Sequence, residues 1–174
     1  ATASAKRAVR SGATATRSDP ELRARRRPFY EAALTPRQQT PLRRRTRVRA
    51  ILAMARGLLS ERPEARLWVS LGQAGDRSDE DILNLSQAVW EARPDRVSLR
   101  EVVGYERGRE RGEVRAMMNE KLIQLGQSAD KILLHEDEVS SIEGALEWAR
   151  PDDLIVHLVH IEREAVREVL EQRR

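Results

Sequence analysis

Between residues 46 and 174, apolar positions recur alternately with the spacing of a helix and the spacing of a strand. Apolar residues three or four positions apart predict helices over residues 48–59, 79–92, 114–125, 139–149 and 161–172. Short apolar runs between these segments predict strands over residues 66–71, 96–100, 131–135 and 154–159. Strands that alternate with helices of about 10–15 residues indicate βαβ units. The predicted fold is therefore α/β, with three layers and a mostly parallel sheet.

Residues 1–45 differ from the rest of the chain in composition and charge. They contain two arginine triplets, few apolar residues and no sustained hydrophobic period. Residues 1–50 hold 14 Lys+Arg against 3 Asp+Glu, a net +11, whereas residues 51–174 hold 18 against 25, a net −7. Because so little apolar surface cannot offset the entropy of ordering, we predict a basic, low-order N-terminal segment over residues 1–45. A loosely docked arm and a transit peptide are the alternatives. Residues 46–174 form the predicted α/β domain.

The composition excludes several classes of protein. The chain has no cysteine, which excludes disulfides and thiolate metal sites. It has neither an apolar run of about 18 residues nor a secretory signal, so we expect a cytoplasmic protein without a membrane span. The aromatic content of 3% provides no stacking platform for nucleic acid, and the predicted domain is acidic. Only the basic segment is expected to bind polyanions, and only nonspecifically.

The segment that joins the first predicted strand to the next helix is the first candidate site. It reads G-Q-A-G-D-R over residues 72–77, and Ser78 follows as the predicted helix N-cap. Ligands of open α/β sheets bind where strands end, and backbone amides near a helix N-terminus can hold an oxyanion. No G-x-x-x-x-G-K-[S/T] or G-x-G-x-x-G motif occurs, so neither a Walker loop nor a conventional dinucleotide site is expected. The alternative is a structural turn that needs the backbone freedom of Gly72 and Gly75.

A second charged loop follows the second predicted strand. Residues 101–115 interleave arginines and glutamates around three glycines. Because the carboxyl ends of parallel strands meet at one edge of a sheet, this loop should lie beside the first turn. Guanidinium groups suit carboxylate or phosphate ligands, although charge runs of this kind are also common on solvated surfaces. The candidate substrate- or nucleotide-facing residues are Gly72, Gly75, Asp76, Arg77, Arg107 and Arg109.

The histidines make a weaker case for a metal site. His157 and His160 are three residues apart across a strand end, but nothing in the sequence supplies further ligands, so no metal site is expected. The acids of H-E-D-E at residues 135–138 can attract a cation, but they more simply favour the N-terminus of the following helix. No Ser-His-Asp or Cys-His arrangement is evident, so no catalytic residue is assigned.

Three segments carry a resemblance to a known family. They read A-G-D-R-S-D-E-D-I at 74–82, R-E-V-V-G-Y-E-R-G-R-E-R-G-E-V at 100–114 and A-R-P-D-D-L-I-V at 149–156. In order and spacing they resemble the C-terminal domain of Mur-type ligases, above all that of cyanophycin synthetase and its relatives. The resemblance covers about residues 48–160 and implies a Rossmann-like fold.

The resemblance also implies an activity. Members of this family use ATP and Mg²⁺ to activate a carboxylate as an acyl phosphate, which an amino group then attacks to form an amide. Their C-terminal domain closes over ATP held by a central P-loop domain and helps to place the incoming amino acid or peptide. By motif match, Asp76, Arg77, Arg107 and Arg109 would face that interdomain cleft and position anionic groups. The expected partner is an ATP-binding ligase domain in the same or another chain.

The chain also departs from the family pattern. It has no P-loop, and residues 41–50 read P-L-R-R-R-T-R-V-R-A where the family has a D-Y-x-H-N-P-like segment that helps to bind the nucleotide. We therefore expect no tightly bound cofactor and no ligase activity from this chain alone. One hypothesis is that residues 1–47 come from outside the family's reading frame. The alternative functions are a stand-alone interaction module whose basic segment contacts an acidic partner and, less favoured, a nonspecific nucleic-acid binder.

Overall fold

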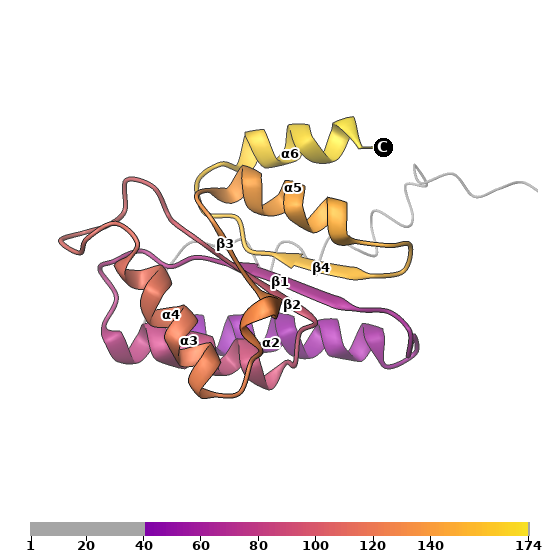
Figure 1. The fold of residues 1–174 in the computed structure, drawn as a ribbon, viewed down its shortest axis with the longest axis horizontal. Coiled ribbons are helices and arrows are strands. Elements are labelled where there is room, and N and C mark those ends of the chain that lie inside the picture. The colour runs from indigo at the N-terminus through magenta and orange to yellow at the C-terminus, as the bar shows by residue number, and fades with distance from the viewer. Residues whose placement is uncertain (1–40, 174) are drawn as a thin grey trace, which may run out of the picture. The chain divides into compact units, whose positions relative to one another are not determined.

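The four predicted strands form one parallel sheet (Figure 1). The strand order is β3-β2-β1-β4, with β1 at Leu67–Leu71, β2 at Arg96–Arg100, β3 at Ile132–His135 and β4 at Leu154–His157. Val69 of β1 lies opposite Val97 on one side and Val156 on the other. Every residue of β1 is buried, as expected for an inner strand of a parallel sheet that is covered on both faces.

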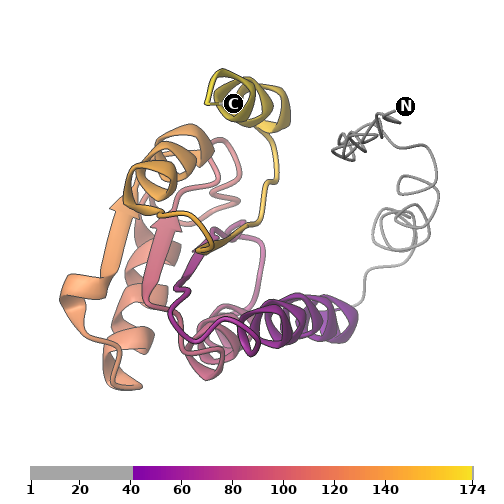
Figure 2. The same cartoon turned by 90° about the vertical axis from the view of Figure 1, so that its right-hand side faces the viewer.

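Helices cover both faces of this sheet, and the computed structural model describes residues 41–173, with side chains from residue 47. On one face lie α2 (Pro41–Leu59), α3 (Asp79–Glu91) and α4 (Glu113–Gln124). On the other lie α5 (Glu138–Trp148) and α6 (Arg163–Gln172), so that α2 and α6 are on opposite sides of the sheet in Figure 2. Among the described residues, none of the helices combines the length and the apolar character needed to cross a membrane. The fold is a three-layer Rossmann-like α/β fold, which confirms the predicted class.

Two hydrophobic clusters, one on each face, hold the layers together. Alternate residues of β1 contribute to each cluster, because successive side chains of a strand point to opposite faces. The larger cluster joins the sheet to α2, α3 and α4 and includes Leu52, Ala55, Leu67, Val69, Leu71, Ile82, Val89, Val97, Leu99, Val114, Met118 and Leu122. The smaller cluster lies under α5 and α6 and is built on Trp68, Ile142, Ala145 and Val166.

Besides shifts of one or two residues at other boundaries, the elements differ from the predicted ones in three ways. Helix α2 begins at Pro41, before the predicted domain boundary, because proline is well tolerated in the first turn of a helix. A short 3-10 helix, η1 (Ala129–Lys131), precedes β3 and was not predicted. Strand β4 ends at His157 instead of residue 159, and because His157 pairs with Ser70, it ends one position before the end of its neighbour β1 at Leu71. The predictions for residues 1–40, including their low order, lie outside the described residues.

An ion pair joins the starts of β1 and β4 and leads to a first testable expectation. The Asp153 carboxylate accepts hydrogen bonds from the backbone N–H of Arg66 at 2.9 Å and of Arg150 at 2.8 Å, and from the Arg66 guanidinium. The Arg66 hydrogen bond is the main cause that lowers the pKa of Asp153 to about 2. We expect Asp153→Asn to reduce the free energy of unfolding by about 2 kcal/mol in urea denaturation at neutral pH.

The sign of the pH dependence follows from that depressed pKa. Since the pKa of Asp153 is lower in the folded than in the unfolded protein, its contribution is full above the usual value of 3.8 and is lost as the pH falls towards 2. The matched control is Asp152→Asn, because Asp152 is 73% exposed and only pairs with Arg62 at 3.4 Å. If Asp153→Asn and Asp152→Asn lost equal free energies of unfolding, the stabilising role assigned to Asp153 would be contradicted. A difference between the two variants that persists at about pH 2 would contradict it as well.

Candidate functional site

The turn between β1 and α3 carries two of the predicted glycines, and both are explained by close packing. A Cβ atom on Gly75 would lie 1.8 Å from the Glu106 carbonyl oxygen, and one on Gly72 would lie 2.7 Å from the Arg100 carbonyl oxygen. Neither glycine is among the residues with positive φ. The expected need for backbone freedom was therefore the wrong reason for these glycines, which instead let the chain approach the loop after β2.

The two charged loops do pack together at the carboxyl edge of the sheet. The Gly75 N–H donates to the Tyr105 carbonyl at 2.8 Å. Arg109 then ties the loops together, because its guanidinium donates to the carbonyl oxygens of Gly75 and Arg77, each at 3.0 Å. The same guanidinium pairs with Asp79 at 2.5 Å and with Glu113 at 2.6 Å. Arg109 thus has an internal, structural set of partners.

The remaining predicted residues of these loops are more open to solvent. Arg107 is exposed, adopts a left-handed φ of 51° and stacks its guanidinium 4.8 Å from the centre of the Tyr105 ring. Asp76 is exposed and lies 3.4 Å from the Nε of Arg77. Arg77 itself is mostly buried, with a side chain that is 24% exposed. Of the four charged candidates, Arg77 is therefore the one that enters a concave site.

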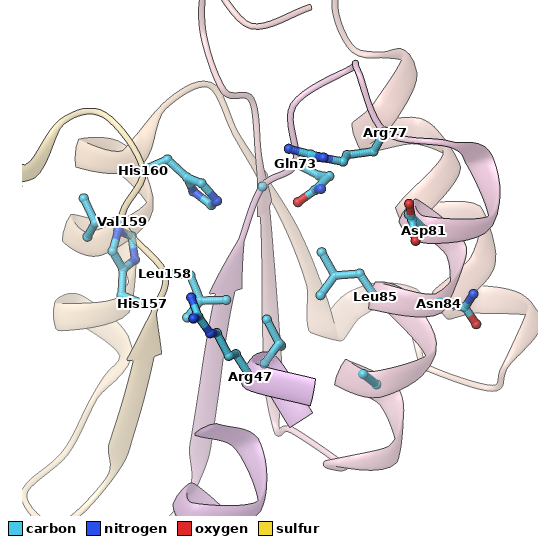
Figure 3. A pocket seen from close by; sticks show the side chains of 13 residues that line it. Arg47, Gln73, Arg77, Asp81, Asn84, Leu85, His157, Leu158, Val159 and His160 are labelled. Atoms are coloured by element: carbon cyan, nitrogen blue, oxygen red, sulfur yellow. The ribbon is translucent and has the colours of Figure 1, made fainter. Parts of the chain in front are cut away.

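That concave site is a pocket of about 500 Å³ at the carboxyl ends of β1 and β4. The chain continues from β1 to β2 on one side and returns to β4 on the other, so the pocket lies at the topological switch point of the sheet. Figure 3 shows the lining side chains, which come from α2, the β1–α3 turn, α3 and the segment after β4. They are Arg47, Val48, Gly72, Gln73, Arg77, Asp81, Asn84, Leu85, Ala88, His157, Leu158, Val159 and His160.

Nitrogen-bearing side chains dominate the polar part of this lining. Arg77 and Gln73 lie together at one end of the pocket, His160 projects from the segment after β4, and Arg47 reaches in from α2 (Figure 3). Among the described residues, Asp81 is the only acidic one that lines the pocket. The apolar part, which includes Leu85, comes mainly from α2, α3 and the end of β4. A pocket of this size and composition suits a small molecule with an anionic group.

His157 is a half-buried residue of this lining. Both of its ring nitrogens are buried and lack a hydrogen-bond partner among the described residues. Burial is the main cause that lowers the pKa of His157 to about 4, and the nearby charge of Arg100 adds to the effect. At neutral pH the ring is therefore uncharged.

Beneath the pocket lies a buried ion pair that the sequence analysis did not anticipate. Arg100 and Glu138 have side chains that are 0% and 1% exposed, and Arg100 Nη1 lies 3.0 Å from Glu138 Oε1. Burial lowers the pKa of Arg100. For Glu138, burial opposes ionisation, but the charge of Arg100 and hydrogen bonds from backbone N–H groups, including that of His160, together lower its pKa to about 2. Both groups are assigned as charged.

The acids at 135–138 have structural partners. Asp137 is the N-cap of α5 and accepts a hydrogen bond from the Ser140 N–H at 2.7 Å, which agrees with the expectation that these acids favour the N-terminus of that helix. Glu136 pairs with Arg111 and Arg115 on the surface. Within residues 47–173, no group of three or more His, Asp or Glu side chains is arranged to hold a metal ion.

The sequence analysis therefore identified the β1–α3 turn as part of a site, but it did not identify the contributions of α2 and of the segment after β4. Of its candidates, Gly72 and Arg77 line the pocket and Gly75 lies in the same turn, whereas His160 was considered only as a metal ligand. Sequence reasoning missed Arg47, Gln73 and the Arg100–Glu138 pair. The available signal was topological: once a fourth strand pairs with β1, the residues after β4 must lie beside those after β1.

Comparison with models of known protein families and with curated proteins gave no match to this chain. The functional interpretation therefore depends on the geometry of the pocket and on the motif resemblance.

Proposed function

We propose that residues 47–173 act as the C-terminal domain of an ATP-dependent carboxylate–amine ligase of the Mur type. One observation supports this above others: the segments 74–82 and 100–114, which carry the motif resemblance, pack against each other at the edge that holds the pocket. A domain of this kind closes over ATP bound to a P-loop domain and positions the amino-acid substrate. The proposed location is the cytoplasm.

The residues of this chain are better suited to bind the amino-acid substrate of such a reaction than to bind the phosphates of ATP. Helix α3 has Asp79, Glu80 and Asp81 in its first turn, and these carboxylates repel a polyphosphate at the helix N-terminus. The pocket beside it instead collects Arg47, Arg77 and His160 around a space of about 500 Å³. ATP and Mg²⁺, bound on the partner domain, would supply the acyl phosphate.

The chemical role proposed for this chain is electrostatic positioning. A charge-assisted hydrogen bond from Arg77 to a substrate carboxylate would hold the substrate at one place and one orientation. The attack of the amine on the acyl phosphate forms the C–N bond and releases phosphate, and it requires no nucleophile from this domain. The exposed guanidinium of Arg107 would face the partner domain, which suits its location outside the pocket.

Calorimetric titration of the chain with Mg–ATP and with a panel of single amino acids tests this proposal. We expect at least one amino acid to bind in the millimolar range, no ATP turnover by the chain alone, and about tenfold weaker binding in Arg77→Ala. Arg107→Ala should bind like the unaltered chain, because Arg107 lies outside the pocket. The matched control is Arg62→Ala, an exposed arginine that pairs with Asp152. ATP turnover by this chain, or no amino-acid binding at all, would overturn the proposal.

A further inference from the structure

The segment that follows β4 is held in place by one buried carboxylate. Glu138, the first residue of α5, accepts backbone N–H groups from His160 at 2.6 Å, from Ile161 at 3.2 Å and from Glu162 at 2.7 Å. Three such bonds to one carboxylate fix the path of the segment. This segment forms the wall of the pocket from which the His160 side chain projects (Figure 3).

The Arg100 guanidinium links this carboxylate to the His160 ring. Its Nη2 donates to the Leu158 carbonyl and lies 3.1 Å from His160 Nδ1, while its Nη1 faces Glu138. Gly72 leaves room for this arrangement, since a Cβ atom there would lie 3.0 Å from Nη1. The floor of the pocket and the orientation of His160 are therefore set by the same buried pair.

These contacts determine where the imidazole carries its hydrogen. A guanidinium can only donate hydrogen bonds, so His160 Nδ1 must accept, and a neutral imidazole then carries its hydrogen on Nε2. The Glu138 carboxylate lies 3.6 Å from the same Nδ1, farther than Arg100, so the shorter contact sets the tautomer. His160 thereby keeps an Nε2–H donor that Arg100 does not use.

We propose that His160 is a ligand-contacting N–H donor in this pocket, and that Arg100 and Glu138 are the pair that positions it. With Arg47, Arg77 and Gln73, the Nε2–H makes one set of donors around a partly apolar space of about 500 Å³. The ligand class is a small molecule with a carboxylate or phosphate group. The inference deepens the proposed function because it uses the same pocket, but it requires neither ATP nor a partner domain.

The imidazole ¹⁵N chemical shifts of His160, measured on the full chain at about pH 8, test the positioning role directly. We expect the Nε2–H tautomer, because Arg100 occupies Nδ1. A purely structural role of the Arg100–Glu138 pair would not fix the tautomer of His160, so the Nε2–H tautomer reports its positioning role. An Nδ1–H tautomer, or an imidazolium that persists at this pH by pairing with Glu138, would overturn the assignment.

NMR chemical-shift titrations with inorganic phosphate and with acetate test whether the pocket binds an anion. They also show whether it prefers a phosphate or a carboxylate group. We expect one of these ions to shift the amide signals of Gly72, Gln73 and His160 with saturation. His160→Ala should weaken this binding about fivefold to tenfold, while His160→Gln, which keeps an N–H donor and an acceptor for Arg100, should stay within about threefold. Arg62→Ala should bind like the unaltered chain.

The outcomes also separate this inference from the ligase proposal. Equal binding by His160→Ala and the unaltered chain, or no binding of either ion, would overturn the inference. If an ion binds as expected but no amino acid does, the ligase proposal fails while the anion pocket stands. Binding of an amino acid that is unaffected by His160→Ala would leave the ligase proposal in place and remove the role of His160.

Discussion

Replacement of Glu138 by glutamine is expected to lower the free energy of unfolding by about 3–5 kcal/mol at neutral pH. The change removes the negative charge but keeps the size of the side chain, so it leaves the Arg100 guanidinium charged and buried without its paired carboxylate. Arg100 is only 2% exposed and cannot recover water. Urea denaturation monitored by tryptophan fluorescence measures the loss, which is large relative to the total stability of a domain of this size.

The pH dependence of this loss gives an internal check on the cause. The pKa of Glu138 is about 2 in the folded protein, below its usual value of 4.5. Its contribution is therefore complete above about 4.5, and it is lost as the pH falls towards 2, where the protonated carboxyl resembles the glutamine amide. The difference in stability between the unaltered chain and Glu138→Gln should shrink over that window.

The matched control lies on the same helix. Glu143 is exposed on α5, so Glu143→Gln should change the free energy of unfolding by less than about 0.5 kcal/mol. A loss in Glu138→Gln no larger than in this control would mean that the buried pair contributes nothing net to stability, and the account of the pocket floor would have to be abandoned.

Local sequence patterns were sufficient for most of the fold. Hydrophobic spacing located the four strands and five α-helices of residues 41–173, and Gly126, just after α4, adopts the left-handed φ of 99° that is common for a glycine at the end of a helix. Ser78 caps α3 by accepting the Asp81 N–H at 3.2 Å, also as predicted. These features depend on residues that are close in sequence, which is why periodicity and capping rules find them.

The pocket could not be predicted in the same way, because its residues meet only through the strand order. Local pattern does not reveal that β4 joins the sheet beside β1, which brings His160 across from Gln73. Arg100 ends a short strand in which polar and apolar residues alternate. This pattern predicts a surface position for Arg100, since arginine is rarely buried unless it is paired. Its partner Glu138 is 38 positions away in sequence, and nothing local connects the two.

The charged loop after β2 illustrates a different limit of sequence reasoning. The pattern correctly placed Arg109 at the edge that holds the β1–α3 turn, but arginines that bind a ligand and arginines that hold a loop look alike in sequence. The structure separates them, since the Arg109 guanidinium is held by two backbone carbonyls and two carboxylates of the protein, whereas Arg77 lines the pocket. The number of internal partners, which depends on the packed loops, is what distinguishes the two roles.

Replacement of Gly75 by alanine is expected to lower the free energy of unfolding by about 3 kcal/mol, the upper part of the range for overpacking. The added Cβ atom would lie 1.8 Å from the Glu106 carbonyl oxygen, so the two loops must separate by more than an ångström. The separation stretches the Gly75–Tyr105 hydrogen bond and the bond from Arg109 to the Gly75 carbonyl. Urea denaturation measures the loss, and amide hydrogen exchange of Gly75 reports whether its bond opens.

Gly57→Ala is the matched control, because it makes the same chemical change where no atom lies within 4 Å of the new Cβ. Gly57 is within helix α2, where alanine is favoured over glycine by about 0.5–1 kcal/mol, so this variant should gain stability. If Gly75→Ala lowers the free energy of unfolding and Gly57→Ala raises it, the loss at Gly75 is due to steric conflict and the gain at Gly57 is due to backbone entropy. If Gly75→Ala instead kept full stability and slow exchange at residue 75, the two loops would not be in contact, and the pocket edge built on them would be wrong.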